Sequence, residues 1–244
     1  MTNTSHTTPT RRGSPIRAWF SRHATALFVG GFGAAFAIAG IVILTVALPA
    51  ARARASAAAG LPGIRIAAAG TLPAGTRVLL EARIADEVPT PYGQFVAFRR
   101  QEFRGWKEEN GRRTEQWTTK EVVVPPLSLA DAGATLPVVN AGYVMELEPH
   151  TWQSTGSLEH SLLGESTQRL TGFHRGDRVT VEGVLGDGGA GRVIEATVVA
   201  GGTRADYIAS LEGAVPTLKI VGSIFAGVGA LMAVLGIVVG RRRS

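Results

Sequence analysis

Three histidines in the middle of the chain are the residues best suited to chemistry. They are His150, His160 and His174, and the first two lie close to Glu148 and Glu159. A histidine beside a carboxylate can act as a general base in hydrolysis, and three such side chains can bind a metal ion. The spacing favours neither, because no H-x-x-x-H or H-E-x-x-H pattern occurs and no cysteine is present to complete a zinc site.

Two further patterns resemble catalytic motifs but lack their context. Ser157, His174 and Asp177 are not accompanied by the G-x-S-x-G elbow of a hydrolase. The run at 186–191 matches G-x-G-x-x-G, but a strand-like run follows it where a dinucleotide site needs a helix. We interpret this run as a hairpin turn. We therefore predict no catalytic, cofactor-binding or metal-binding residue, and a hydrolase using His174 with a nearby carboxylate is the less favoured alternative.

Aromatic and basic residues flank an Asn-Gly pair at 110–111. This pair predicts a tight hairpin, because both residues tolerate the positive φ of a type I′ turn. The expected facing pairs are Glu108–Arg113, Trp106–Glu115, Arg104–Trp117, Glu102–Thr119, Arg100–Glu121 and Phe98–Val123. Two of these are ion pairs, and one allows an arginine to stack on a tryptophan.

The aromatic residues of this hairpin allow two interpretations. Packing in the core and between strands is the favoured one, for Phe95, Phe98, Phe103, Trp106 and Trp117. If the cluster is exposed, it marks a binding surface. The candidate interaction surface is Arg100, Arg104, Trp106 and Trp117.

The elements that must position these residues are mostly strands. Short runs rich in Val, Ile, Phe and Trp, bounded by turn residues, predict strands at 64–68, 77–84, 94–106, 114–124, 143–147, 178–185 and 192–199. A short helix is expected at 204–212, separated by Pro216 from the apolar run that follows.

One stretch of the chain repeats. Residues 75–86 and 176–187 share Gly, Arg, Val, Glu and Asp in register, which predicts two similar strand–turn units in one domain. Such strands also open OB-like barrels, so an oligonucleotide-binding barrel is a rival interpretation. Its binding face would need exposed aromatics in a positive groove, which the acidic balance of the domain disfavours.

Two apolar runs bracket the strands. Residues 27–48 and 220–240 contain no charged side chain, and each has the roughly 20 apolar positions that cross a bilayer as a helix. The first could instead be a signal peptide, but it is longer than the 7–15 residues usual for that class. We therefore predict an uncleaved anchor at each end.

The expected organisation follows from these runs. It comprises a disordered basic tail (1–23), a transmembrane helix (24–48), a linker or helical extension (49–62), a β-rich α+β domain (63–217), a second transmembrane helix (218–240) and a basic tail (241–244). Small residues four apart let helices approach closely. The predicted helix-packing positions are Gly30, Gly33, Gly222, Gly236 and Gly240.

The charge distribution orients the predicted spans. Residues 49–218 hold 17 Lys and Arg against all 19 Asp and Glu, so their net charge is −2, although the chain carries +6. The basic excess flanks the spans, and such flanks stay cytoplasmic during insertion. We expect cytoplasmic termini and an extracytoplasmic middle domain, although Arg52 and Arg54 oppose this orientation. The expected partner is the lipid bilayer, with an unidentified protein or lipid, and not nucleic acid.

Several stretches, taken in order, resemble a known family. They are 78–84, 88–91, 95–103, Trp117, 124–129, 132–134, 176–185 and 207–212. With the plan of span, β-rich domain and span, they resemble the GIDE-domain family, which includes mitochondrial outer-membrane ubiquitin ligases of the MULAN/MAPL type. The resemblance covers about 63–240. A weaker one, through 99–108 and Trp117, is to the transmembrane protein 43 family.

The resemblance has a departure that bears on activity. Ligases of the family carry a cysteine- and histidine-rich RING finger after the second span, whereas here Arg-Arg-Arg-Ser follows it and the chain has no cysteine. The resemblance therefore implies a prokaryotic-type member of the family that lacks the RING finger and is located in the plasma membrane. Its domain would be like that of an E3 ubiquitin ligase, without the ligase activity.

These observations together predict a membrane-proximal binding module rather than an enzyme. It would recognise a peptide, lipid or protein partner in an envelope-stress or assembly role. The alternative is a structural subunit of a membrane assembly, with the spans carrying the function. A membrane-tethered hydrolase is the third and least favoured hypothesis.

Overall fold

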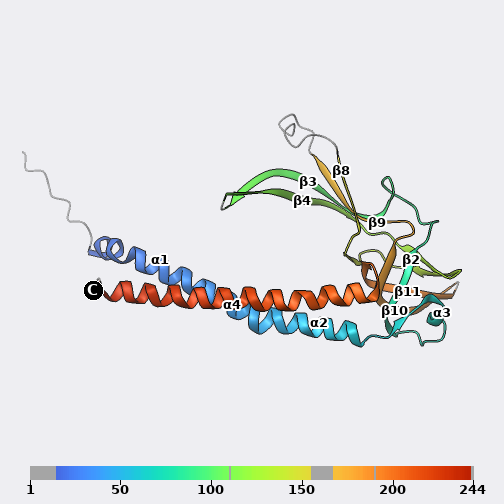
Figure 1. Cartoon of the computed structure of the whole chain (residues 1–244), viewed down its shortest axis with the longest axis horizontal. Helices are drawn as coiled ribbons and strands as arrows, with labels where there is room; N and C mark the ends of the chain where they lie inside the picture. Colours follow the sequence, from blue (N-terminus) through green and yellow to red (C-terminus); the bar gives the residue numbers. More distant parts are fainter. Residues whose placement is uncertain (1–14, 110, 155–166, 190, 243–244) are drawn as a thin grey trace, which may run out of the picture. The chain divides into compact units, whose positions relative to one another are not determined.

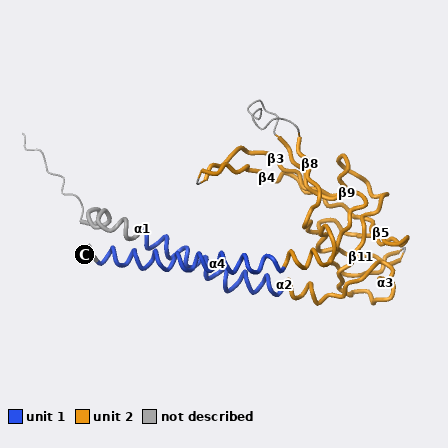
Figure 2. Tube along the Cα trace, in the orientation of Figure 1, with its two compact units in different colours: residues 1–53, 212–244 blue, residues 54–211 orange. Residues whose placement is uncertain are grey.

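The chain folds into two long apolar helical runs that flank a β-rich domain (Figure 1). The computed structural model describes residues 15–109, 111–154, 167–189 and 191–242. It contains two compact units, Met1–Ala53 with Glu212–Ser244, and Arg54–Leu211 (Figure 2). The predicted α+β class, with two apolar helices around a β-rich domain, is confirmed.

Both helical runs are longer than predicted. The first comprises α1 (Pro15–Val42), the π-helical turn η1 (Ile43–Ala47) and α2 (Leu48–Gly60), and the second is α4 (Arg204–Arg242). The stretch expected as a linker or a helical extension is helical up to Gly60, because alanine has the highest helix propensity. The predicted helix break at Pro216 is wrong, since α4 continues through it. Proline removes only one backbone donor, and apolar helical residues follow it without a further break.

Five strands close into a barrel. They are β2 (Arg77–Ile84), β5 (Leu127–Asp131), β6 (Ala134–Val138), β11 (Gly191–Gly201) and β10 (Arg178–Gly188), in that spatial order. The ring closes because β2 pairs with both β5 and β10. Its β6–β11 pair is parallel and its other pairs are antiparallel. This strand order is that of an OB barrel, the rival architecture that the sequence left open.

Two short strands extend the barrel sheet, and apolar side chains fill the barrel. β1 (Gly63–Ile64) pairs with β2, and β7 (Val144–Glu146) pairs with β11. Inward-facing residues alternate along the ring strands, as closure requires. The buried set includes Val78, Leu80, Ile84, Leu129, Leu136, Val181, Leu185, Ile194 and Val199.

A second sheet is inserted into two connections of the barrel. Its order is β4 (Arg112–Val123), β3 (Phe95–Glu109), β9 (Gln168–His174) and β8 (His150–Gln153). The β3–β4 pair lies between β2 and β5 in sequence, and β8–β9 lies between β6 and β10. The strands β5, β6, β8 and β9 had not been predicted. The strand expected at 64–68 is wrong beyond residue 64, because the alanine run forms α3 (Ile66–Ala69).

The internal repeat forms two matching turns that face each other. Gly75 donates its backbone N–H to the carbonyl of Leu185 (2.7 Å), and Gly176 donates to the carbonyl of Ile84 (2.8 Å). Both glycines have positive φ, 86° and 76°, which an L side chain rarely adopts. The prediction of two similar strand–turn units is therefore confirmed, and the units pair antiparallel as β2 and β10.

Candidate functional site

The predicted hairpin forms, with its predicted register at both ends. The facing pairs Glu108–Arg113, Trp106–Glu115, Arg100–Glu121 and Phe98–Val123 are confirmed. Gly111 has a φ of 72°, as a turn glycine should, and Asn110 lies outside the described residues. The glycine-rich run at 186–191 also connects two antiparallel strands, β10 and β11, so its interpretation as a hairpin is confirmed.

The middle of the predicted hairpin register is wrong. Trp117 faces Phe103 rather than Arg104, and Thr119 faces Gln101 rather than Glu102. The register shifts twice. Between Phe103 and Gly105, β3 has an extra residue, Arg104. Opposite the step from Arg100 to Gln101, β4 has an extra residue, Lys120. Each β-bulge inserts one unpaired residue, and the second restores the register that the first had lost.

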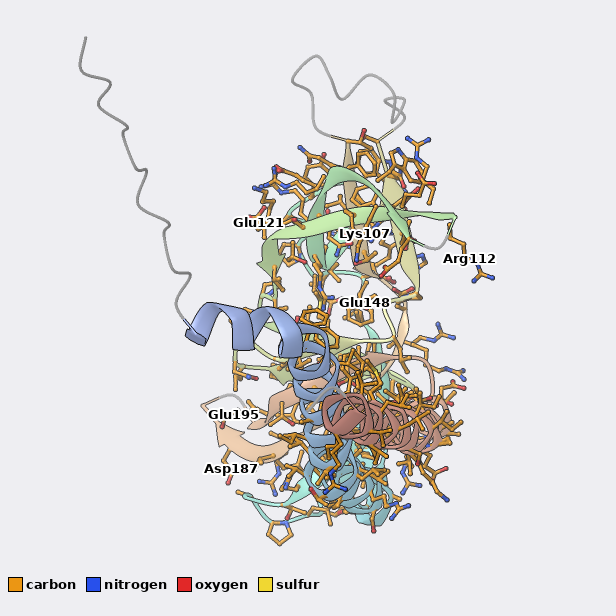
Figure 3. All side chains as sticks on the ribbon, turned by 90° about the vertical axis from the view of Figure 1, so that its left-hand side faces the viewer. Lys107, Arg112, Glu121, Glu148, Asp187 and Glu195 are labelled. Carbon is orange, nitrogen blue, oxygen red and sulfur yellow. The ribbon has the colours of Figure 1, made fainter. Side chains whose placement is uncertain are left out.

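The outer half of the hairpin is a two-stranded arm, residues 103–117, which we call the hairpin arm. The strand β9 pairs with β3 only as far as Glu102, and the backbone N–H of Phe103 still donates to the carbonyl of Thr167 (2.9 Å). Beyond Phe103, β3 pairs with β4 alone within the described chain. Lys107 and Arg112 lie near its tip, where the side chain of Arg112 extends away from the ribbon (Figure 3). An isolated two-stranded hairpin is marginally stable, so side-chain contacts must support it.

Aromatic rings and arginines supply those contacts. The ring of Phe103 lies 5.6 Å from Trp106 and 5.4 Å from Trp117, edge to face. The guanidinium of Arg113 lies 4.5 Å from the centroid of Trp106, and that of Arg169 lies 4.3 Å from Trp117. The predicted stacking of an arginine on Trp117 therefore occurs, but Arg169 provides it from β9.

The four predicted surface residues separate into two groups. Trp106 and Trp117 belong to this aromatic–arginine cluster, and Trp106 remains 38% exposed. Arg100 instead forms an ion pair with Glu121 (3.0 Å), and Arg104 is exposed and lies 3.9 Å from Glu102. Of the rest of the predicted aromatic cluster, Phe95, Phe98 and Phe103 are buried.

Three of the predicted helix-packing glycines, Gly30, Gly33 and Gly236, lie at the contact between α1 and the later part of α4. A Cβ on Gly33 would lie 2.5 Å from the backbone nitrogen of Ala233, and one on Gly30 would lie 3.8 Å from Cα of Gly236. Gly222 faces side chains of η1, and Gly240 also has an interaction partner. The tightest positions, Gly40 and Gly229, were not predicted.

A histidine–aspartate cluster lies beside an apolar pocket; its three residues were named from the sequence, but no site was predicted from them. The rings of His150 and His174 stack in parallel with centroids 3.8 Å apart. His150 Nε2 lies 2.8 Å from Asp177 Oδ1, and the backbone N–H of His174 donates to Asp177 Oδ2 (2.7 Å). His160, Ser157 and Glu159 lie outside the described residues.

One of the two matching turns carries this chemistry. His174 and Asp177 flank Gly176, whereas the equivalent positions around Gly75 hold Pro73 and Thr76. In that other turn the Thr76 hydroxyl donates to the Pro73 carbonyl (2.7 Å). The two turns therefore share a backbone conformation, but one carries uncharged side chains and the other carries an imidazole and a carboxylate. His150 then reaches the cluster because β8 pairs with β9.

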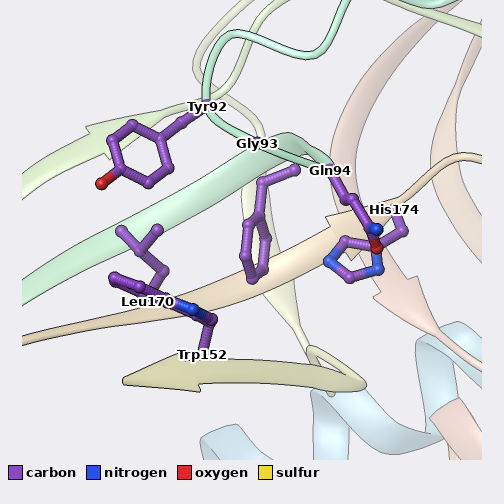
Figure 4. A pocket seen from close by; sticks show the side chains of 7 residues that line it. Tyr92, Gly93, Gln94, Trp152, Leu170 and His174 are labelled. Atoms are coloured by element: carbon purple, nitrogen blue, oxygen red, sulfur yellow. The ribbon is translucent and has the colours of Figure 1, made fainter. Parts of the chain in front are cut away.

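The pocket lies next to His174. Its volume is about 410 Å³, and Tyr92, Gln94, Phe95, Trp152, Leu170 and His174 line it (Figure 4). The ring centroid of Trp152 lies 6.3 Å from that of Tyr92. Within the described residues, no group of three His, Asp or Glu side chains is placed to hold a metal ion. In the same part of the chain, neither imidazole forms a hydrogen bond with a hydroxyl group that could serve as nucleophile.

Acidification is expected to destabilise the β domain through His174. Burial, and secondarily the neighbouring His150, hold the pKa of His174 below its usual value, against the opposing effect of Asp177. As the pH falls past about 6.5, the unfolded chain takes up the proton first. The stability that neutral His174 contributes is complete above that pH and is lost as the pH falls through the folded-state pKa. The fall in Tm from about pH 8 to about pH 5 should be smaller for His174→Phe than for the wild type. Equal drops would contradict the assignment.

Comparison with known protein families, with characterised proteins and with solved structures finds no match to this chain. The resemblance to the GIDE-domain family therefore stays a prediction. A barrel topology alone is compatible with many functions, so the function depends on the residues of the site itself.

Proposed function

We propose that the chain is a two-pass membrane protein whose β domain acts as a binding module through the hairpin arm. The observation that carries the proposal is the outer edge of β4, which begins in the arm: β4 is exposed along most of its twelve residues and pairs only with β3 within the described chain. Such an edge offers backbone donors and acceptors to another extended segment. The partner we propose is an extended peptide segment of a second protein.

The chemistry of the arm supports a specific contact. Trp106 presents an exposed ring that Arg113 holds in place, and aromatic and arginine side chains dominate the binding energy of many interfaces. Charged residues such as Lys120 and Glu121 flank the edge, and they disfavour unspecific strand pairing. The arm therefore combines an open backbone edge with a side-chain anchor.

The membrane part of the proposal is supported by length and composition. The helices Phe28–Gly60 and Arg204–Arg241 have a mean hydropathy of 2.3 over their most apolar windows. Their 33 and 38 residues exceed the roughly 20 needed to cross a bilayer, so each would extend beyond it. The positive flanks favour cytoplasmic termini in the plasma membrane. In the terms of the family resemblance, the chain would be a GIDE-like module without ligase activity.

The alternative, a structural subunit of a membrane assembly, is less favoured for a specific reason. It needs small-residue helix faces that are available to other chains. An added Cβ on Gly33 or on Gly229 would instead lie only 2.5 Å or 2.2 Å from the backbone of the opposing helix of the same chain. Packing within one chain therefore occupies the faces on which that hypothesis depends.

The test removes the arm and keeps the rest of the protein. Residues 104–116 are replaced by Asn-Gly, which joins the facing residues Phe103 and Trp117 by a tight turn. A photo-reactive amino acid is placed at the exposed Thr118 in both the full-length and the shortened chain, in native membranes. We expect a defined crosslinked partner with the full-length chain, and loss of that crosslink with the shortened one.

Two controls make the result interpretable. Thermal unfolding shows whether the shortened chain remains folded, and a photo-reactive group at exposed Val139, on the barrel side, should give the same products in both chains. A crosslink at residue 118 that persists without the arm would overturn the proposal.

A further inference from the structure

The pocket beside the histidine pair has the features of a binding site for a single ring. Phe95 and Leu170 are buried at 5% and 1% exposure, whereas Tyr92 and Trp152 are 46% and 44% exposed. Buried apolar residues therefore form its base, and two aromatic rings stand at its opening (Figure 4). Its volume of about 410 Å³ lies in the range of small-ligand pockets, which are mostly apolar with few polar groups.

His174, which lines this pocket, has a ring nitrogen without a partner in the described part of the chain. His174 Nε2 is buried and makes no hydrogen bond within the described residues. The ring cannot turn freely to find one, because it stacks on His150 and packs edge to face with Phe95, with 4.5 Å between the centroids. A buried polar atom without a partner is unfavourable, and a ligand that hydrogen-bonds to it removes that penalty.

We propose that this pocket binds a neutral phenolic ring, as carried by a tyrosine side chain of a peptide. The aromatic walls favour a flat ring, which can pack edge to face against them. A hydroxyl both donates and accepts, so it satisfies His174 Nε2 in either tautomer. We expect the ring to be uncharged, because both oxygens of Asp177 are already engaged, by His150 and by the backbone of His174, and do not offer a free charge to a ligand. This site does not depend on the hairpin arm.

The test compares two soluble ligands that differ by one hydroxyl, N-acetyl-tyrosinamide and N-acetyl-phenylalaninamide. The full-length protein, labelled with ¹⁵N in its histidine rings, is titrated with each in detergent micelles. We expect the tyrosine compound to shift the Nε2 resonance of His174 and to bind about five-fold more tightly, as one added hydrogen bond implies. His174→Phe, which also assigns the resonance, should abolish the preference.

Variants at the opening separate the ring contact from the hydrogen bond. Trp152→Ala and Tyr92→Ala alter residues that are 44% and 46% exposed, and each should weaken the binding of both compounds to the same extent. Val139→Ala, at a similarly exposed position that does not line the pocket, should change neither affinity. Equal affinity for the two compounds in the wild type, or affinities unchanged by Trp152→Ala, would overturn the proposal.

Discussion

Replacing Gly172 by alanine is expected to destabilise the β domain by about 3 kcal/mol, the upper end of what overpacking usually costs. Gly172 is buried in β9 where that strand pairs with both β3 and β8. A Cβ there would lie 2.1 Å from the carbonyl oxygen of Ala97 and 2.8 Å from Cα of Phe98. Both are backbone atoms, so relief requires the strands to separate rather than a side chain to rotate.

The measurement is denaturant unfolding of the full-length protein, with Gly70→Ala as the matched control. Gly70 has a φ of −68°, and an added Cβ there would meet nothing within 4 Å. Gly70→Ala should therefore leave the free energy of unfolding unchanged or raise it slightly, by about 0.4–1 kcal/mol. Similar effects of the two substitutions would contradict the close approach of β9 to β3.

Gly172 also connects stability to the pocket. It lies between Leu170 and His174 on the same face of β9, and it faces His150 on β8. A shift of β9 would displace the imidazole stack together with the base of the pocket. Loss of stability and loss of the ring-binding site should therefore occur together in Gly172→Ala, whereas Trp152→Ala should affect the pocket alone.

Turns were the features best predicted from the sequence, because their signals are local. Asn-Gly at 110–111 predicted the hairpin, and the repeat at 75–86 and 176–187 predicted two similar units. In both cases a glycine meets a backbone requirement that other residues satisfy poorly. The glycine-rich run at 186–191 was correctly separated from a dinucleotide site for a similar reason, since the residues after it form a strand.

The bulges in the hairpin could not be predicted in this way. The residues around Arg104 and Lys120 carry no signal that distinguishes them from a regular strand, apart from Gly105 with a φ of 116°. What fixes the bulges is packing across strands, where Phe103 meets Trp117 and Arg169 stacks over the latter. Arg169 lies on β9, a strand that the sequence did not predict.

The residues of the histidine cluster were named from the sequence, but their clustering was not predicted, because their spacing in the sequence says nothing about their geometry. His150 and Asp177 are 27 positions apart, and a short strand pair and a turn bring them within 2.8 Å. The strand β8 has only four residues and includes one histidine, so it lacks the apolar alternation by which strands are recognised. A signal was nevertheless present, since Asp177 and His174 replace Thr76 and Pro73 of the matching turn.

The helix contact shows the same limit. Small residues four apart identified Gly33 as a packing position, but the spacing did not distinguish it from Gly31, which has open space around it. Which glycine faces the other helix depends on the rotation of both helices. Three-dimensional packing fixes that rotation, and the composition of one segment does not.

Replacing Gly229 by leucine is expected to separate α1 from the later part of α4. An added Cβ at Gly229 would lie 2.2 Å from the backbone nitrogen of Ala37 and 2.7 Å from the carbonyl oxygen of Gly33. Helices that pack through glycines lose their contact when a bulky side chain enters the interface, because backbone atoms cannot move aside. We expect the helix pair to open in native membranes.

The absence of cysteine from the chain makes this measurable. Cysteines at Phe36 and Phe225, whose rings are 5.0 Å apart, can be joined by a short bifunctional thiol reagent, and the linked peptides counted by mass spectrometry. Gly229→Leu should reduce linkage several-fold. Gly227→Leu is the matched control, because a Cβ on Gly227 meets nothing within 4 Å and the substitution changes the same helix by the same volume. Equal linkage in the two variants would show that the contact between these helices does not depend on the close approach at Gly229.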